Sequence, residues 1–165
     1  IQAGAAGAGT TTPQVHNSGA LPPQLPVQTS AVAGGKRMAH ERFGFELTVP
    51  EAIEIERFQE EGGAETMVFF DPTTQQEFQL FVTPYDKKEI TKERLQLDIK
   101  NGIVKNMQEI ILPSGMRATT FESEVPGIGP TREVWFIEKG HLYEITVAKQ
   151  CDVWLSQIMT TWKVQ

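Results

Sequence analysis

The sequence has a single cysteine, Cys151, among 165 residues, and it lacks long apolar runs. One cysteine excludes an internal disulfide framework and a multi-cysteine zinc site. The apolar runs are only a few residues long, far short of the roughly 20 that a membrane-spanning helix needs. There is also no His-Glu-x-x-His motif and no glycine-rich loop followed by the lysine of a nucleotide site. These absences argue against most familiar enzyme chemistries.

The remaining candidates for chemistry are isolated from one another. Cys151 has no histidine nearby in the sequence, and the carboxylate of Asp152 beside it opposes thiolate formation. The histidines, His16, His40 and His141, have no second ligand at metal-binding spacing. We therefore predict no catalytic residue, no metal site and no cofactor.

Charge is divided unevenly along the chain. The first forty residues contain no Asp or Glu and only two basic residues, whereas the remainder has 13 Lys and Arg against 21 Asp and Glu. A net acidic domain is poorly suited to phosphate backbones, so we expect no nucleic-acid partner. An acidic cluster over residues 51–65 and a basic one over residues 87–94 can steer a charged partner, but solvated faces are the simpler explanation.

Residues 1–40 are rich in Ala, Gly, Thr, Pro and Gln, without aromatic residues or apolar periodicity. Such a segment cannot bury enough apolar surface to fold, so we predict a disordered linker with a root-mean-square span of about 35 Å. Because the chain begins at Ile1 rather than Met, we interpret the linker as a tether to a membrane anchor upstream. A dispensable tail or a cloning remnant is the alternative.

Residues 41–165 predict one globular domain. Period-two alternation of apolar residues over 43–49 indicates a strand with one buried face, and further strands are predicted at residues 53–56, 67–70, 78–83, 109–112 and 117–122. The early strands follow one another through short turns, including Gly62-Gly63, which favours an antiparallel meander. The segment 125–130, with two glycines and two prolines, is predicted to be a loop.

Two helices and a hairpin complete the expected domain. Thr91 is a plausible N-cap for a helix that ends near Asn101-Gly102, and Asp152 is expected to cap a terminal helix whose apolar stripe reaches Trp162. The strongest hairpin signal joins 132–138 to 141–148 through Lys139-Gly140. Because several strands are apolar on both faces, we predict an α+β fold with an antiparallel sheet sandwiched between helices.

Three motifs together resemble the PsbP-like or DcrB-like domain family. They are the first strand Phe43-Gly-Phe-Glu-Leu-Thr-Val-Pro50, the hairpin from Trp135 to Val147, and the closing helix from Asp152 to Trp162. The resemblance implies an α/β/α sandwich and a mostly non-enzymatic accessory or binding role. It carries over no metal-binding or partner-binding residue, and the chain lacks a lipobox cysteine, so the form of anchoring stays open.

The leading hypothesis is a non-catalytic binding or accessory module that contacts a protein partner and is held at the cell envelope, outside the cytoplasm. Phe81 and Trp135 are the candidate contact residues, because each lies on the opposite strand face from its apolar neighbours. We favour the alternative that both pack under the helices. Two other functions stay open. One is an enzyme, which needs two buried carboxylates within about 10 Å in a cleft; the other is a cytoplasmic GTPase-regulating module, by analogy of fold.

Overall fold

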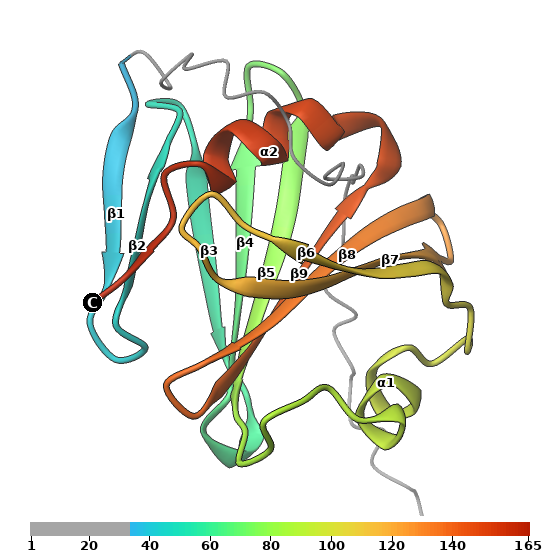
Figure 1. Ribbon diagram of the computed structural model, residues 1–165. Helices are drawn as coiled ribbons and strands as arrows, with labels where there is room; N and C mark the ends of the chain where they lie inside the picture. The colour runs from blue at the N-terminus through green and yellow to red at the C-terminus, as the bar shows by residue number, and fades with distance from the viewer. Residues whose placement is uncertain (1–33) are drawn as a thin grey trace, which may run out of the picture.

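The structure is a computed structural model that describes residues 34–165, so most of the predicted linker lies outside the described residues. A seven-stranded antiparallel sheet dominates it, in the order β3-β4-β5-β9-β8-β7-β6 (Figure 1). Its strands are β3 (Glu54–Gln59), β4 (Glu65–Asp71), β5 (Gln76–Pro84), β6 (Lys105–Ile111), β7 (Arg117–Val125), β8 (Gly129–Glu138) and β9 (His141–Ala148). The predicted meander corresponds to β3, β4 and β5.

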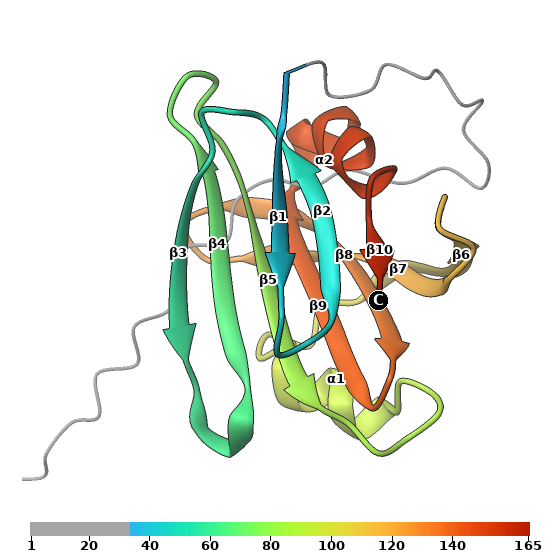
Figure 2. The same ribbon diagram turned by 90° about the vertical axis from the view of Figure 1, so that its left-hand side faces the viewer.

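A second sheet has the order β1-β2-β10 and consists of β1 (Lys36–His40), β2 (Phe45–Val49) and β10 (Lys163–Val164). Figure 2 shows β1 and β2 in front of the large sheet. This arrangement corrects two expectations. The folded part begins before residue 41, because β1 pairs with β2 over its whole length. The first predicted strand, β2, therefore belongs to a separate sheet and not to the meander.

The main core fills the space between the two sheets and under α2 (Asp152–Met159). Trp162, just after this helix, stacks on Phe45 of β2 with ring centroids 4.6 Å apart. The short 3-10 turn η2 (Lys149–Cys151) leads into α2. Cys151 is the N-cap and no side chain caps the helix, so the predicted capping role of Asp152 is wrong. Asp152 instead occupies the first turn, where a negative charge suits the helix dipole.

The opposite face of the large sheet is covered in part by α1 (Lys92–Asp98), which lies apart from α2 in Figure 1. Thr91 is its N-cap, as predicted, and the Thr91 hydroxyl accepts a hydrogen bond from the backbone N–H of Arg94 at 3.2 Å. Beneath α1 lies a second apolar cluster of Phe121, Trp135 and Leu142, separate from the main core. No residue of α1 itself is fully buried.

The tight turns agree with the glycine signals in the sequence. The 3-10 turn η1 (Glu61–Gly63) joins β3 to β4, and both of its glycines have positive φ. Lys139 and Gly140, with φ of 48° and 77°, form the two-residue turn of the predicted β8–β9 hairpin. Half of the predicted loop at 125–130 belongs to strands, because Val125 pairs with Gly129 across a turn formed by residues 126–128. The expected fold class, an antiparallel sheet between helices, is confirmed. Within residues 34–165, neither helix has the length and apolar character to cross a membrane.

Candidate functional site

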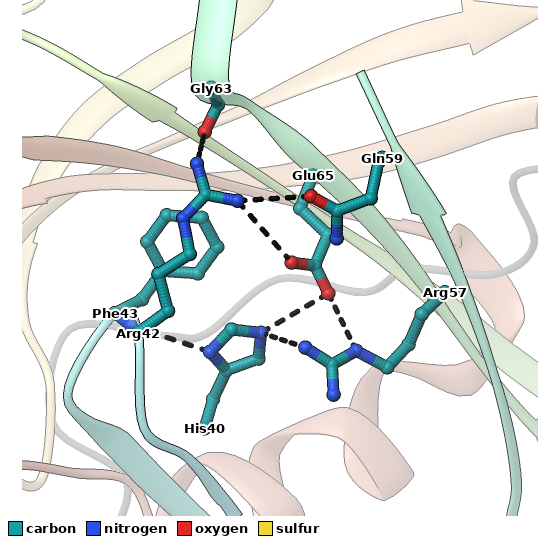
Figure 3. Close-up of polar contacts among 7 residues, drawn as sticks. All are labelled: His40, Arg42, Phe43, Arg57, Gln59, Gly63 and Glu65. Atoms are coloured by element: carbon teal, nitrogen blue, oxygen red, sulfur yellow. Dashed lines mark hydrogen bonds and ion pairs between the residues drawn. The ribbon is translucent and has the colours of Figure 1, made fainter.

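One polar cluster joins the two sheets around Glu65 (Figure 3). The Glu65 side chain, at the start of β4, is completely buried. Its Oε1 accepts a hydrogen bond from Arg57 Nε at 2.6 Å and lies 3.1 Å from His40 Nε2. Arg42 Nη1 lies 4.0 Å from the other carboxylate oxygen and donates to Gln59 Oε1 at 3.0 Å. We call these five residues the Glu65 cluster.

The environment of Glu65 keeps it ionised. Burial alone would raise its pKa, but hydrogen bonds from Arg57, His40 and Gln59 outweigh burial and lower the pKa to about 2. The carboxylate therefore holds residues of β1, β3 and β4 together as an ion pair network. This geometry assigns the cluster to the junction between the sheets.

The protein itself contacts both the ring and the two ring nitrogens of His40. It stacks on Phe43 and Phe45 with centroids 4.7 and 5.3 Å away. The backbone N–H of Phe43 donates to Nδ1 at 3.4 Å, and Nε2 faces both Glu65 and Arg57. A general base needs a ring nitrogen within reach of a substrate. Both nitrogens of His40 are occupied by the protein, so the Glu65 cluster is structural.

The face of the large sheet under α1 carries the second set of polar groups. Strand register places Phe81 of β5 opposite Glu144 of β9, and Glu144 opposite Trp135 of β8. The next row of the same face pairs Thr146 of β9 with Glu133 of β8. Because side chains alternate along a strand, these residues all lie on the α1 side of the sheet.

The two predicted contact residues therefore share one row of this face. Trp135 is only 1% exposed and packs edge-on against Phe121 at 5.2 Å. Phe81 is partly exposed, and the Arg94 guanidinium lies 5.8 Å from its ring centroid. Trp135 is thus packed under α1, as in the alternative that both residues pack under the helices. Phe81 remains partly accessible to solvent.

Glu144 and Asp98 share a single arginine. The Glu144 side chain is 7% exposed, and its Oε1 accepts from Arg94 Nη2 at 3.1 Å and Nε at 3.3 Å. Arg94 also forms an i,i+4 ion pair with Asp98 on α1. Burial raises the pKa of both carboxyl groups, and the charge of Asp98 raises the pKa of Glu144 further. Because both carboxyl groups pair with the same arginine, they lie near each other, and the charge of one opposes ionisation of the other.

Glu133 is buried, and neutral side chains supply the hydrogen bonds that it accepts. Its carboxyl oxygens accept from the Thr131 hydroxyl at 3.0 Å, the Thr146 hydroxyl at 2.5 Å and Trp135 Nε1 at 3.4 Å. Burial outweighs these hydrogen bonds and raises the pKa of Glu133 to about 7. On the same face of β5, burial and the charge of Glu56 raise the pKa of Glu77 to about 7 as well.

Sequence reasoning missed these acids as a group. Glu133 and Glu144 alternate with apolar neighbours, a pattern that by itself is typical of residues facing solvent. A usable signal was present: Trp135 and Phe136 are adjacent, so both faces of β8 must be covered, and an acid on either face becomes buried. Among residues 34–165, no three His, Cys, Asp or Glu side chains are grouped closely enough to hold a metal ion.

Comparisons with known proteins identify the fold. No protein-family model matches the chain, and no curated protein matches it. A similar solved structure is the solution structure of cyanobacterial PsbP (CyanoP) from Synechocystis sp. PCC 6803. It has a TM-score of 0.56 and 13% sequence identity, and the match covers 87% of this chain and 100% of that one. The likeness shows that this chain has a PsbP-like fold, as the resemblance of its motifs implied.

Proposed function

From this PsbP-like fold, we propose that the domain is a non-catalytic binding module that contacts a protein partner through the sheet face under α1. The observation that carries the proposal is the Phe121, Trp135 and Leu142 cluster. It is separate from the main core and is covered by partly buried residues between Tyr85 and Val104. Segments with few buried apolar contacts open locally at low free energy, and such segments often move when a partner binds.

The contact residues that we propose are Phe81 and Trp135. Phe81 is accessible while α1 is in place, and Leu97 on α1 is 66% exposed. Trp135 is buried on the same sheet face under α1, so it can contact a partner only after α1 has moved. Aromatic residues of this kind are frequent at the centres of protein interfaces because each buries a large apolar area.

The ionisable groups support a binding role because they are committed to internal contacts. The Glu65 cluster joins the sheets, Arg94 holds Glu144 and Asp98, and Glu133 accepts from three side chains. A substrate would have to replace these contacts before any of these acids could act on it. Buried polar groups that lose their partners cost about 1–3 kcal/mol each.

Cross-linking tests the partner surface. The photoreactive amino acid p-benzoylphenylalanine is placed at Phe81 in the full chain expressed in its native host, and at Val153 on α2 as the control, because Val153 is 71% exposed on the other helix. We expect a discrete protein adduct after irradiation at position 81 that is missing at position 153. Identical adducts at both positions, or none at position 81, would contradict the proposed surface.

A specific observation also favours a second candidate, a hydrolase with paired carboxylates. Glu133 and Glu144 occupy diagonal positions on neighbouring strands, and such positions lie about 7–8 Å apart. Two side chains on such positions can hold their carboxyl groups at the roughly 6.5–9.5 Å found in inverting glycosidases. Release of nitrophenol from nitrophenyl glycosides tests it. Turnover that disappears in both Glu133→Gln and Glu144→Gln, with the fold intact, would replace the binding module by an enzyme.

We further propose that the domain is held outside the cytoplasm. The composition of residues 1–35 supports this proposal, because an uncharged Pro-rich and Gly-rich stretch suits a spacer between an anchor and a domain. Fractionation of the full-length protein from its native host, with protease treatment of intact cells, tests it. Degradation of the domain in intact cells supports the tether. Recovery in the cytosolic fraction would instead favour the GTPase-regulating alternative.

A further inference from the structure

The segment from Tyr85 to Val104 crosses the sheet face between the end of β5 and the start of β6, and we call it the α1 cover (Figure 1). Its start is fixed by the backbone N–H of Tyr85, which donates to Gly140 O at 2.8 Å. Near its end, the Asn101 side chain donates to the backbone oxygen of Glu124. Between these points, the charged contact to the body of the sheet is that of Arg94 with Glu144.

The charges at this contact are not balanced. On the α1 side stand Arg94 and Asp98, with Lys100 just beyond the helix; the sheet contributes Glu144 from β9. Glu133 of β8 is the next acid on the same face, diagonal to Glu144. The Tyr85 hydroxyl donates to the Glu89 carbonyl and brings no charge. When both carboxyl groups of the Asp98–Glu144 pair are ionised, one guanidinium faces two carboxylates at close range.

We propose that this contact is a pH-dependent latch: the α1 cover stays closed while one carboxyl group of the Asp98–Glu144 pair is protonated, and it loosens when both groups are ionised. Loosening uncovers Trp135 and its apolar neighbours. The role of the latch in regulating partner binding rests on the proposed function. The pH-dependent opening of the α1 cover follows from the arrangement of the charges and does not depend on that function.

The α1 side of the contact is the one that moves. Glu144 is held in the middle of the sheet, because β9 is hydrogen-bonded to β5 on one side and to β8 on the other. The α1 helix has seven residues and none of them is fully buried. Repulsion between Asp98 and Glu144 is therefore relieved by displacement of α1 rather than by displacement of β9.

The direction of the pH response follows from proton binding. Burial raises the pKa of both carboxyl groups in the closed form, so the closed form binds more protons than the open one. Such a form is favoured at low pH and loses its advantage as the pH rises through the raised pKa. The cover thus opens with rising pH.

Hydrogen exchange of the full chain tests the latch. After correction for intrinsic exchange rates, protection of the α1 amides should fall at least about tenfold between pH 5 and pH 9, the factor that one pKa unit provides. In the Glu133→Gln background, which removes the global loss of stability caused by ionisation of Glu133, protection of the β8 and β9 amides near Glu144 should change much less. In Glu144→Gln, the amide oxygen can still accept from Arg94 but the charge is gone, so protection of α1 should become independent of pH.

The matched control is Glu77→Gln. Glu77 is also a buried acid on this face, but it lies near the start of β5, whereas Tyr85 follows the other end of that strand. Its replacement should therefore leave the pH dependence of α1 protection unchanged. A second measurement uses fluorine NMR of protein labelled with 5-fluorotryptophan. The Trp135 signal, assigned with Trp135→Phe, should shift with pH, while Trp154 and Trp162 in the main core serve as references.

Two outcomes would overturn the latch: α1 protection in the wild-type protein that does not vary with pH, or a pH response that persists unchanged in Glu144→Gln. The partner surface fails separately. If the latch responds to pH but cross-linking at Phe81 gives no adduct at any pH, the proposed function is wrong and the latch stands. If adducts form with the same pH dependence in the wild type and in Glu144→Gln, the regulation is wrong and the partner surface stands.

Discussion

Replacing Glu133 by Gln should remove most of a pH-dependent loss of stability. Glu133 is 2% exposed, and burial raises its pKa from 4.5 to about 7. A carboxyl group whose pKa is raised in the folded state favours folding while it is protonated, and this contribution disappears as the pH rises through the folded pKa. At about 1.36 kcal/mol per pKa unit, full ionisation of Glu133 costs the folded domain about 3 kcal/mol.

The loss is spread over a defined pH range. With a pKa of 4.5 in the unfolded chain and about 7 in the folded domain, roughly 2 kcal/mol of this loss in stability occurs between pH 5 and pH 7. Glutamine has nearly the same shape, and its amide oxygen can accept from the Thr131 and Thr146 hydroxyls. We therefore expect Glu133→Gln to be within about 1 kcal/mol of the wild type at pH 5 and about 2–3 kcal/mol more stable at pH 8.

Urea unfolding followed by tryptophan fluorescence measures this difference, because the change in midpoint at constant slope reports stability. Unfolding curves are recorded at several pH values from 5 to 8.5 for the wild type and the variant. Glu109→Gln on the exposed edge strand β6 is the control for the change in net charge. If the stabilities of wild type and Glu133→Gln run parallel across this pH range, the reasoning about Glu133 is refuted.

Two further predictions concern the Glu65 cluster and Trp135. Glu65→Gln should destabilise the domain at pH 7 by about 2 kcal/mol, a reduced figure because the Arg57 side chain is 52% exposed and can be hydrated. The loss should shrink as the pH falls from 4.5 towards 2, where the wild-type carboxylate is protonated; equal losses at pH 3 and pH 7 in urea unfolding would contradict this. Trp135→Ala should lower stability by about 3–5 kcal/mol, whereas Trp135→Phe should keep most of it. Thermal unfolding measures both, and a stable Trp135→Ala would show that Trp135 is not part of the core under α1.

The elements with strong local signals could be predicted from the sequence. The Lys139-Gly140 turn and the alternation on either side of it gave the β8–β9 hairpin, and Thr91 marked the start of α1. Strand β1 was missed because Lys36–His40 offers only Met38 as a large apolar residue. Its stability comes from pairing with β2, which is a non-local contact that no local pattern reveals.

The candidate site was harder to predict for a related reason. The strand register agrees with the prediction that Phe81 and Trp135 lie on the opposite strand face from their apolar neighbours, but the acids on that face were not anticipated. Whether Glu133 and Glu144 are buried depends on what covers their face, and the cover comes from α1, more than thirty residues earlier in the chain. Alternation identifies the face of a strand, whereas burial of that face depends on tertiary packing.

The two polar clusters respond to pH in opposite directions. The Glu65 cluster supplies arginine and histidine donors to one carboxylate, so the ionised form is favoured and its contribution is lost in acid. The face under α1 buries Glu133 and the Asp98–Glu144 pair with one arginine, so the protonated forms are favoured and their contribution is lost as the pH rises. Stability should therefore peak at mildly acidic pH, between the pKa of about 2 for Glu65 and that of about 7 for Glu133. Because the clusters involve different elements, acid should first weaken the junction between the sheets, whereas base should first weaken the attachment of α1.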